Sequence, residues 1–297
     1  MARVAFLGLG QMGAPMAGRL FQAGYGLTVW DVVPGGGTAL VRRGAELAPS
    51  PAAACRGADF IITMLPDPEA LEAVAFGASG IASALTEGQT VVEMSTVGPA
   101  AARSLRARIA PVAMVDAPVL GSVPEAEAGQ LSIFVGGSGA DFECVRPVLE
   151  VLGRPHHVGG PGIGAATKLA VNLTIVAAMA VIGESLAIGG ALGVSREVML
   201  DSLADSPLGG LAKRKRALIE TGEFPPQFKL RLAAKDLRLV DSAATAAGLR
   251  TPITGAVHQW LEEAERAGAG GLDFAALVAL ICQEGPFGPK GAVDAGP

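Results

Sequence analysis

Three glycines near the start of the chain have the spacing of a phosphate-binding turn. Gly8, Gly10 and Gly13 form a G-x-G-x-x-G pattern, preceded by an apolar run at residues 4–7 and followed by a helical pattern at residues 14–22. The first glycine permits a tight turn, the second lets the backbone approach a pyrophosphate, and the third allows close packing of helix on strand. The helix N-terminus then offers N–H groups and a positive dipole end to phosphates.

An acidic residue extends this pattern. Asp31 ends the next apolar run, eighteen residues beyond Gly13, and this context makes the motif specific in a chain with 41 glycines. A carboxylate there accepts hydrogen bonds from ribose hydroxyls and disfavours a 2′-phosphate, and Val32 follows it instead of an arginine. We therefore predict NAD as the cofactor. NADP is the alternative, since Arg42 and Arg43 could reach an extra phosphate, and Asp31 could also merely end a strand.

Lys168 and Asn172 are the next residues that could take part in chemistry. They are four residues apart near the start of a long apolar helical pattern, so they share one face of that helix. A lysine at this place is often only a snorkelling end residue. However, a lysine in a partly apolar cleft beside a cationic nicotinamide would have a lowered pKa and could take a hydroxyl proton. Asn172 could donate to and accept from a substrate.

The elements that must position these residues alternate in the first half of the chain. Continuous apolar runs, which indicate strands buried on both faces, alternate with helical segments. The runs are residues 4–7, 27–30, 59–64, 90–94, 114–119 and 131–135. This pattern predicts an α/β fold, a Rossmann-type doubly wound and mostly parallel sheet.

The second half reads as helix throughout. A glycine-rich loop at residues 159–164 precedes it, and helical patterns follow at residues 164–193, 195–204, 210–220, 229–247, 251–267 and 273–282. Ser195 and Asp273 are expected as N-caps. We predict a dinucleotide-binding domain over residues 1–160, an all-α substrate and dimerisation domain over 161–284, and a disordered tail over 285–297.

Composition excludes several other classes. The formal net charge is -5, which argues against nucleic acid, and the basic run at residues 213–216 is interpreted as a solvated helix face. Residues 169–192 are apolar enough to cross a membrane but carry Asn172 and Glu184, so we expect a helix buried within protein. The three cysteines are widely spaced and form no metal-ligand pattern, so we expect no bound metal. Because no signal peptide is evident either, we expect a cytoplasmic protein with reduced cysteines.

Four ordered blocks resemble the β-hydroxyacid dehydrogenase family, which includes 3-hydroxyisobutyrate dehydrogenase and the glyoxylate/succinic semialdehyde reductases. The blocks are Phe6 to Ala17, Asp116 to Ser122, Gly162 to Asn172 and Lys235 to Leu237, and the resemblance covers essentially the whole chain. It implies hydride transfer between NAD(H) and a small 3-hydroxy acid or its semialdehyde. It also implies a helical domain following the Rossmann domain and a homodimer or homotetramer paired through the long helix.

The resemblance also implies individual roles. Lys168 would be the general acid/base, Asn172 would orient the substrate, and Gly121 and Ser122 would donate to a substrate carboxylate. The cofactor would be bound by Gly8, Leu9, Gly10, Gln11, Met12, Gly13, Asp31, Leu65, Pro66, Thr96 and Lys235.

One block departs from the family pattern. The family usually has Ser-Gly-Gly where this chain has Leu120, Gly121 and Ser122, so the first hydroxyl is missing and bulk is added. Ser122 is a candidate replacement, and the departure argues against 3-hydroxyisobutyrate itself as the substrate.

Two other functions remain open: an imine reductase and a catalytically silent dinucleotide-binding module. Imine reductases commonly replace the catalytic lysine by an acidic residue or tyrosine, and a silent module would be expected to lose it. The retained Lys168 disfavours both. A decarboxylating phosphogluconate-type enzyme would need a much longer helical domain.

Overall fold

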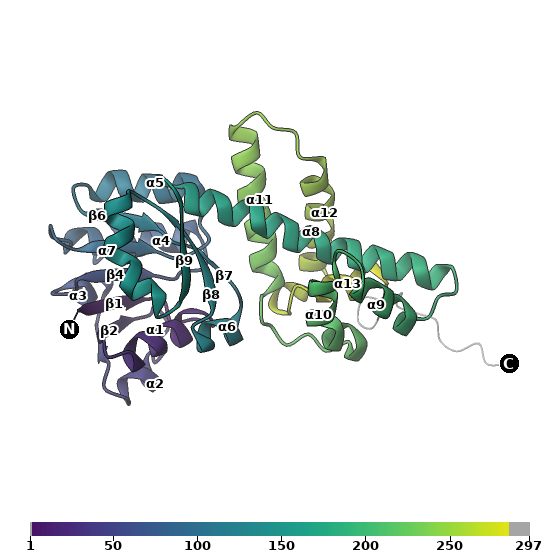
Figure 1. The fold of residues 1–297 in the computed structure, drawn as a ribbon, viewed down its shortest axis with the longest axis horizontal. Helices are drawn as coiled ribbons and strands as arrows, with labels where there is room; N and C mark the ends of the chain where they lie inside the picture. Colours follow the sequence, from purple (N-terminus) through teal and green to yellow (C-terminus); the bar gives the residue numbers. More distant parts are fainter. Residues whose placement is uncertain (1, 285–297) are drawn as a thin grey trace. The chain divides into compact units, whose positions relative to one another are not determined.

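The protein, seen in a computed structural model that describes residues 2–284, consists of two compact units (Figure 1). The division between them falls between Leu169 and Ala170. The first unit contains every strand of the described chain, and the second is helical. The expected disordered tail, residues 285–297, lies outside the described residues.

The first unit is built on one sheet with strand order β3-β2-β1-β4-β5-β6-β8-β7, and β9 pairs with β8. The strands are β1 (Arg3–Leu7), β2 (Gly26–Trp30), β3 (Glu46–Leu47), β4 (Phe60–Thr63), β5 (Thr90–Glu93), β6 (Ala113–Asp116), β7 (Val119–Leu120), β8 (Leu131–Gly136) and β9 (Gly153–Gly159). Pairing is parallel from β3 through β6, while β8 runs antiparallel to β6 and β7. This order is that of a Rossmann fold, so the predicted fold class is confirmed.

Helices cover both faces of this sheet, which explains the continuous apolar strands. They are α1 (Gly13–Gln22), α2 (Thr38–Val41), α3 (Pro51–Cys55), α4 (Pro68–Phe76), η1 (Ile81–Ser83), α5 (Gly98–Ile109), α6 (Val123–Ala128) and α7 (Gly139–Glu150). Phe6 and Ile62 pack into a core with residues of α1 and α7. Leu7 and Ile61 point to the opposite face and pack with residues of α3, α4 and α5.

The second unit has its own apolar core, formed by residues of α8 to α13. Its helices are α8 (Ile163–Ala191), which begins in the first unit, α9 (Arg196–Ala204), α10 (Gly209–Thr221), α11 (Leu230–Ala246), α12 (Pro252–Arg266), η2 (Ala269–Gly271) and α13 (Ala276–Ile281). Helix α8 is long and apolar enough to cross a membrane by those two criteria alone, and 39% of its most apolar window is buried. The same two properties are found in core helices of proteins that never meet a membrane.

The structure differs from the local predictions at several points, among them the short strand β3, which was not predicted. The chain forms β9 over Gly153–Gly159, where no strand was predicted, because the polar residues of this strand hide its pairing with β8. The expected strand at 114–119 is two strands, β6 and β7. The helix expected at 273–282 begins at Ala276, with Asp273 outside it. Ser195, by contrast, is an N-cap as predicted, because its side chain accepts from the Val198 N–H.

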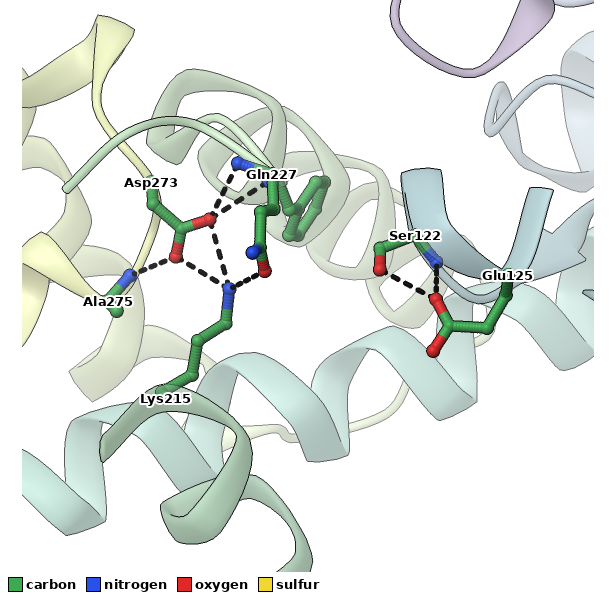
Figure 2. Close-up of polar contacts among 7 residues, drawn as sticks. Ser122, Glu125, Lys215, Gln227, Asp273 and Ala275 are labelled. Carbon is green, nitrogen blue, oxygen red and sulfur yellow. Dashed lines mark hydrogen bonds and ion pairs between the residues drawn. The ribbon is translucent and has the colours of Figure 1, made fainter. Parts of the chain in front are cut away.

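Asp273 instead holds a buried ion pair (Figure 2). Lys215 Nζ lies 2.9 Å from one carboxylate oxygen of Asp273, and the side chains are 4% and 0% exposed. The carboxylate also accepts from the N–H groups of Gln227, Phe228 and Ala275. The interpretation of residues 213–216 as a solvated face is therefore wrong for Lys215. Within a run of four basic residues, the sequence alone did not show which one is buried.

Candidate active site

The glycine-rich turn between β1 and α1 is shaped by close backbone packing. Gly8 has φ +96°, and a Cβ there would lie 2.3 Å from the carbonyl oxygen of Met64. A Cβ on Gly13 would lie 1.9 Å from the carbonyl oxygen of Gly8, whereas a Cβ on Gly10 would meet nothing within 4 Å. Gly8 and Gly13 are thus required for packing, and Gly10 leaves open space where a ligand can approach the backbone.

The same turn is tied to the end of β2. The two carboxylate oxygens of Asp31 accept from different N–H groups, Oδ2 from Leu9 at 2.6 Å and Oδ1 from Val33 at 2.7 Å. The structure therefore brings Asp31, a predicted cofactor residue, to the glycine-rich turn. The carboxylate is held at the carboxyl end of the sheet, where its remaining lone pairs can accept from ribose hydroxyls.

A buried hydrogen-bond chain fixes the loops after β4 and β5. The Leu65 N–H donates to Ser95 Oγ at 2.8 Å, and the Ser95 N–H donates to Glu93 Oε1 at 2.6 Å. The Thr63 hydroxyl donates to the other oxygen of Glu93. Two predicted cofactor residues are therefore tied to this chain of hydrogen bonds: Leu65 is its first donor, and Thr96 follows Ser95 in the sequence. Glu93 was missed by sequence, although a charged residue inside an apolar strand was a detectable signal.

Burial raises the pKa of Glu93 to about 7. The side chain is 1% exposed, so desolvation penalises its carboxylate form more than its hydrogen bonds with Ser95 and Thr63 favour it. Asp116, its register partner on β6, adds a smaller repulsion. The loops beside the predicted nicotinamide site are therefore held by a carboxyl that titrates near neutral pH.

These features together fit a dinucleotide. The turn lies where the strand order reverses, between β1 and β4, which is where doubly wound sheets bind their ligands. Helix α1 has no side-chain cap and no acidic residue in its first turn. Its N-terminus is therefore suited to a pyrophosphate, and the open space at Gly10 admits one.

Asp116 fixes the start of α8, the helix that carries Lys168. Its carboxylate oxygens accept from the N–H groups of Gly162 and Ala165, both at 2.7 Å. Burial raises the pKa of Asp116, and these backbone hydrogen bonds oppose the shift. Lys168 lies one turn further along and is only 8% exposed. Asp116 belongs to one of the family-like sequence blocks, but no role was predicted for it.

Asn172, on the same helix, is held by α11. Its side-chain amide donates to Asp236 Oδ2 at 2.5 Å, and Lys235 Nζ lies 2.7 Å from Asp236 Oδ1. Asn172 and Asp236 are 4% and 2% exposed. Two predicted site residues, Asn172 and Lys235, are thus joined through a carboxylate that sequence reasoning did not assign. The adjacent lysine and aspartate at 235–236 were the available signal.

The predicted substrate loop is bonded to the helix that follows it (Figure 2). The backbone N–H and the hydroxyl of Ser122 both donate to Glu125 Oε2, at 2.8 and 2.7 Å. Gly121 has φ +140°, which favours glycine, and a Cβ there would lie 3.1 Å from the Cβ of Glu125. Sequence reasoning missed Glu125, although Ser122 followed by a glutamate three residues later is a capping-box signature.

Within residues 2–284, no group of three or more His, Cys, Asp or Glu side chains is arranged to hold a metal ion. The groups with chemical functions described above are the glycine-rich turn, the lysine and the amide on α8, and the buried carboxyl groups of Glu93, Asp116 and Asp236.

Comparison with known proteins agrees with this geometry. Residues 3–166 match the NAD-binding domain of 6-phosphogluconate dehydrogenase, and residues 162–281 match the NAD-binding domain of NADP-dependent 3-hydroxyisobutyrate dehydrogenase. The NAD-dependent L-serine dehydrogenase of Pseudomonas aeruginosa is 36% identical over 85% of this chain and 89% of its own. The 3-hydroxyisobutyrate dehydrogenase of the same organism is 34% identical over 94% and 98%.

Solved structures point the same way. The Mycobacterium tuberculosis 3-hydroxyisobutyrate dehydrogenase with L-serine superposes with a TM-score of 0.84 at 29% identity, over 94% of this chain and 98% of its own. An imine reductase from Pseudomonas sp. reaches a TM-score of 0.61 at 27% identity, over 93% and 98%. With family matches over both halves and relatives above 30% identity, the chain belongs to the β-hydroxyacid dehydrogenase family of NAD(P)-binding oxidoreductases, which includes 3-hydroxyisobutyrate dehydrogenase.

Proposed function

We propose that this protein interconverts a small 3-hydroxy acid and its semialdehyde, with Lys168 as the general acid/base. The observation that carries the proposal is the placement of a buried lysine on α8, directly after the turn that Asp116 fixes, with Asn172 one turn further. A bound nicotinamide dinucleotide supplies the hydride acceptor or donor. The chain's own residues then need to bind the alcohol, orient it and move one proton.

In the oxidation direction, the hydroxyl proton passes to Lys168 Nζ as the carbinol carbon loses its hydride. The alcohol O–H bond and one C–H bond break, a C=O double bond forms, and the lysine later releases the proton to solvent. Asn172 donates one amide hydrogen to Asp236, so its second amide hydrogen is left to donate to the substrate oxygen. In reduction the same lysine, as an ammonium, returns the proton.

We infer a preference for NAD over NADP from the end of β2. Asp31 is already held against the glycine-rich turn, where its negative charge would repel a 2′-phosphate. The roles of Gly8 to Gly13, Leu65, Pro66, Thr96 and Lys235 in cofactor binding belong to the same proposal. Val32 and Val33, which follow Asp31, offer no cation to such a phosphate.

We further propose a cytoplasmic, self-associating protein, a homodimer or homotetramer. Its cysteines Cys55, Cys144 and Cys282 are free thiols, as is usual in a reducing compartment. Val181 and Ile188 on α8 are 50% and 60% exposed, and such apolar side chains are commonly covered by another subunit. Sedimentation of the purified protein tests the oligomeric state.

The proposal is tested by following NAD(P)H absorbance with purified protein. NAD and NADP are each paired with a panel of small 3-hydroxy acids, and NADH and NADPH with the matching semialdehydes. The proposal expects turnover with at least one pair and a higher kcat/KM with NAD(H). If cyclic imines were reduced and no hydroxy acid or semialdehyde reacted, the imine reductase alternative would replace it. Cofactor binding without any turnover would favour the silent module.

A further inference from the structure

A continuous series of contacts runs from a buried carboxyl group to the glycine-rich turn. Glu93, at the end of β5, accepts from the Ser95 N–H at 2.6 Å, and Ser95 Oγ accepts from the Leu65 N–H at 2.8 Å. Leu65 and the residue before it lie against Gly8, because a Cβ on Gly8 would be 3.0 Å from Leu65 Cδ2 and 2.3 Å from the Met64 carbonyl oxygen. The loop after β4 is therefore held against the turn through Ser95 and Glu93.

Water cannot take the place of these hydrogen bonds. Glu93, Ser95 and Thr63 are all buried, and the Thr63 hydroxyl donates to the second oxygen of Glu93. The carboxyl group is thus held at both of its oxygens. Loss of its acceptors would leave the Ser95 N–H without a partner in a place that solvent does not reach, and the segment that carries Ser95 Oγ would shift.

The loop after β4 lies on the opposite side of the turn from Asp31. In the strand order β3-β2-β1-β4-β5, the strands β2 and β4 flank β1 on its two sides. A dinucleotide at this switch point spans both sides. With Asp31, at the end of β2, on the adenosine ribose, the nicotinamide nucleotide falls on the side of β4 and β5, where Leu65 and Ser95 are.

We infer that Glu93 is a positioning residue for the nicotinamide half of the cofactor, because it holds the loop after β4 in place through Ser95. The inference rests on the proposed function in one respect: it takes Asp31 as the residue that binds the adenosine ribose and Leu65 as a residue beside the nicotinamide. Glu93 is itself buried, and it acts on the cofactor only through the loop.

Three variants separate the hydrogen bonds of Glu93 from its bulk. Glu93→Met keeps most of the side-chain volume and removes both acceptors. Glu93→Gln keeps a carbonyl oxygen for the Ser95 N–H and an amide for the Thr63 hydroxyl, so it is the conservative variant that should preserve the wild-type behaviour. Ser95→Ala leaves the Ser95 N–H bonded to Glu93 and removes only the acceptor of the Leu65 N–H.

Gln89→Met is the matched control. Gln89 is buried directly before β5, at the opposite end of that strand from Glu93. Its amide donates to the carbonyl oxygens of Cys55 and Ala58, and its oxygen accepts from the Thr86 N–H. This variant therefore also removes buried hydrogen bonds from a side chain of similar size, but at the edge of the sheet away from the glycine-rich turn.

The test compares NADH with ADP-ribose, which has the same adenosine and pyrophosphate but lacks the nicotinamide. Both Kd values are measured by calorimetry at a temperature where each variant is folded. In Glu93→Met and in Ser95→Ala we expect NADH to bind about tenfold more weakly, the size expected for one buried donor left unpaired, with ADP-ribose unchanged. Glu93→Gln and Gln89→Met should bind both ligands as wild type does.

The double variant tests whether Glu93 acts through Ser95. If it does, Glu93→Met combined with Ser95→Ala should weaken NADH no more than the stronger of the two single variants, because both break the same series of contacts. Losses that add up would overturn the inference, since they would show that Glu93 and Ser95 act independently.

Equal weakening of NADH and ADP-ribose in Glu93→Met would also overturn the inference, and so would unchanged binding of both ligands. If Glu93→Met does not fold, Ser95→Ala decides: wild-type affinity for NADH would contradict the route through the Ser95 hydroxyl. Only binding is measured, so the failure of every hydroxy acid and semialdehyde to react would contradict the proposed function and leave the inference standing.

Discussion

Asp236 accepts a hydrogen bond from the side-chain amide of Asn172 at 2.5 Å, and this fixes which end of the amide faces away from α11. The same carboxylate pairs with Lys235 at 2.7 Å. Asp236→Ala would remove the buried acceptor of Asn172 and the ion-pair partner of Lys235. We expect a loss of about 3 kcal/mol in the free energy of unfolding, together with a lower kcat/KM.

Denaturation in urea and steady-state kinetics check this prediction, with Asp201→Ala as the control because its side chain is 64% exposed. Asp236→Asn should lose less than Asp236→Ala, since its carbonyl oxygen can still accept from Asn172. Equal kcat/KM in wild type and Asp236→Ala would show that the bond does not orient Asn172 for catalysis.

The buried carboxyl of Glu93 makes the stability of the protein depend on pH. Its pKa is raised from 4.5 to about 7, so the folded state favours the protonated form. This preference contributes on the order of 3 kcal/mol to the free energy of unfolding. The contribution is fully present below pH 4.5 and is lost as the pH rises through about 7. Glu93→Gln cannot ionise, so we expect a weaker pH dependence of its unfolding free energy across this window. The exposed Glu87→Gln should retain the wild-type slope, and identical slopes in all three proteins would contradict the prediction.

The glycine-rich turn allows cofactor binding to be tested apart from folding. A Cβ on Gly10 would meet nothing within 4 Å, so Gly10→Ala should leave the Tm unchanged and weaken NADH binding at least about tenfold by filling the space for the pyrophosphate. Gly139→Ala, which also meets nothing within 4 Å, is the control for a harmless methyl group. Fluorescence titration with NADH provides both Kd values, and wild-type binding by Gly10→Ala would place the pyrophosphate elsewhere.

The ion pair of Lys215 and Asp273 is expected to stabilise the helical unit without serving catalysis. Lys215→Met removes one partner and leaves the other charge buried, which costs about 3–5 kcal/mol. NADH binding should persist at a temperature where the variant is folded, because the residues proposed for the pyrophosphate are in the other unit. Thermal unfolding followed by titration checks both statements, and a Tm equal to that of wild type would refute the first.

The sequence predicted the elements with strong local signals. Residues such as Phe6 and Ile62 lie in continuous apolar runs, and the order of strands and helices then leaves few topologies. Strand β9 was missed because His156 and His157 give it no apolar pattern, and only its pairing with β8 defines it.

The candidate site was predicted less completely, for a physical reason. Glycine and lysine motifs are defined by local spacing, but the carboxyls that support them act through contacts distant in sequence. Asp116 accepts from the N–H of Ala165, 49 residues further along the chain, and Asp236 accepts from Asn172, which lies 64 residues before it. Glu125 was the exception, since its partner lies three residues away and the capping-box spacing was readable.

The most direct test of the central claim is the effect of Lys168→Ala on kcat, with NADH affinity measured on the same preparation. Lys213→Ala is the control, because that lysine is exposed on α10. If Lys168 moves the proton, kcat should fall about 10²–10⁴-fold while the Kd for NADH stays close to that of wild type. Near-normal turnover by Lys168→Ala would contradict the account.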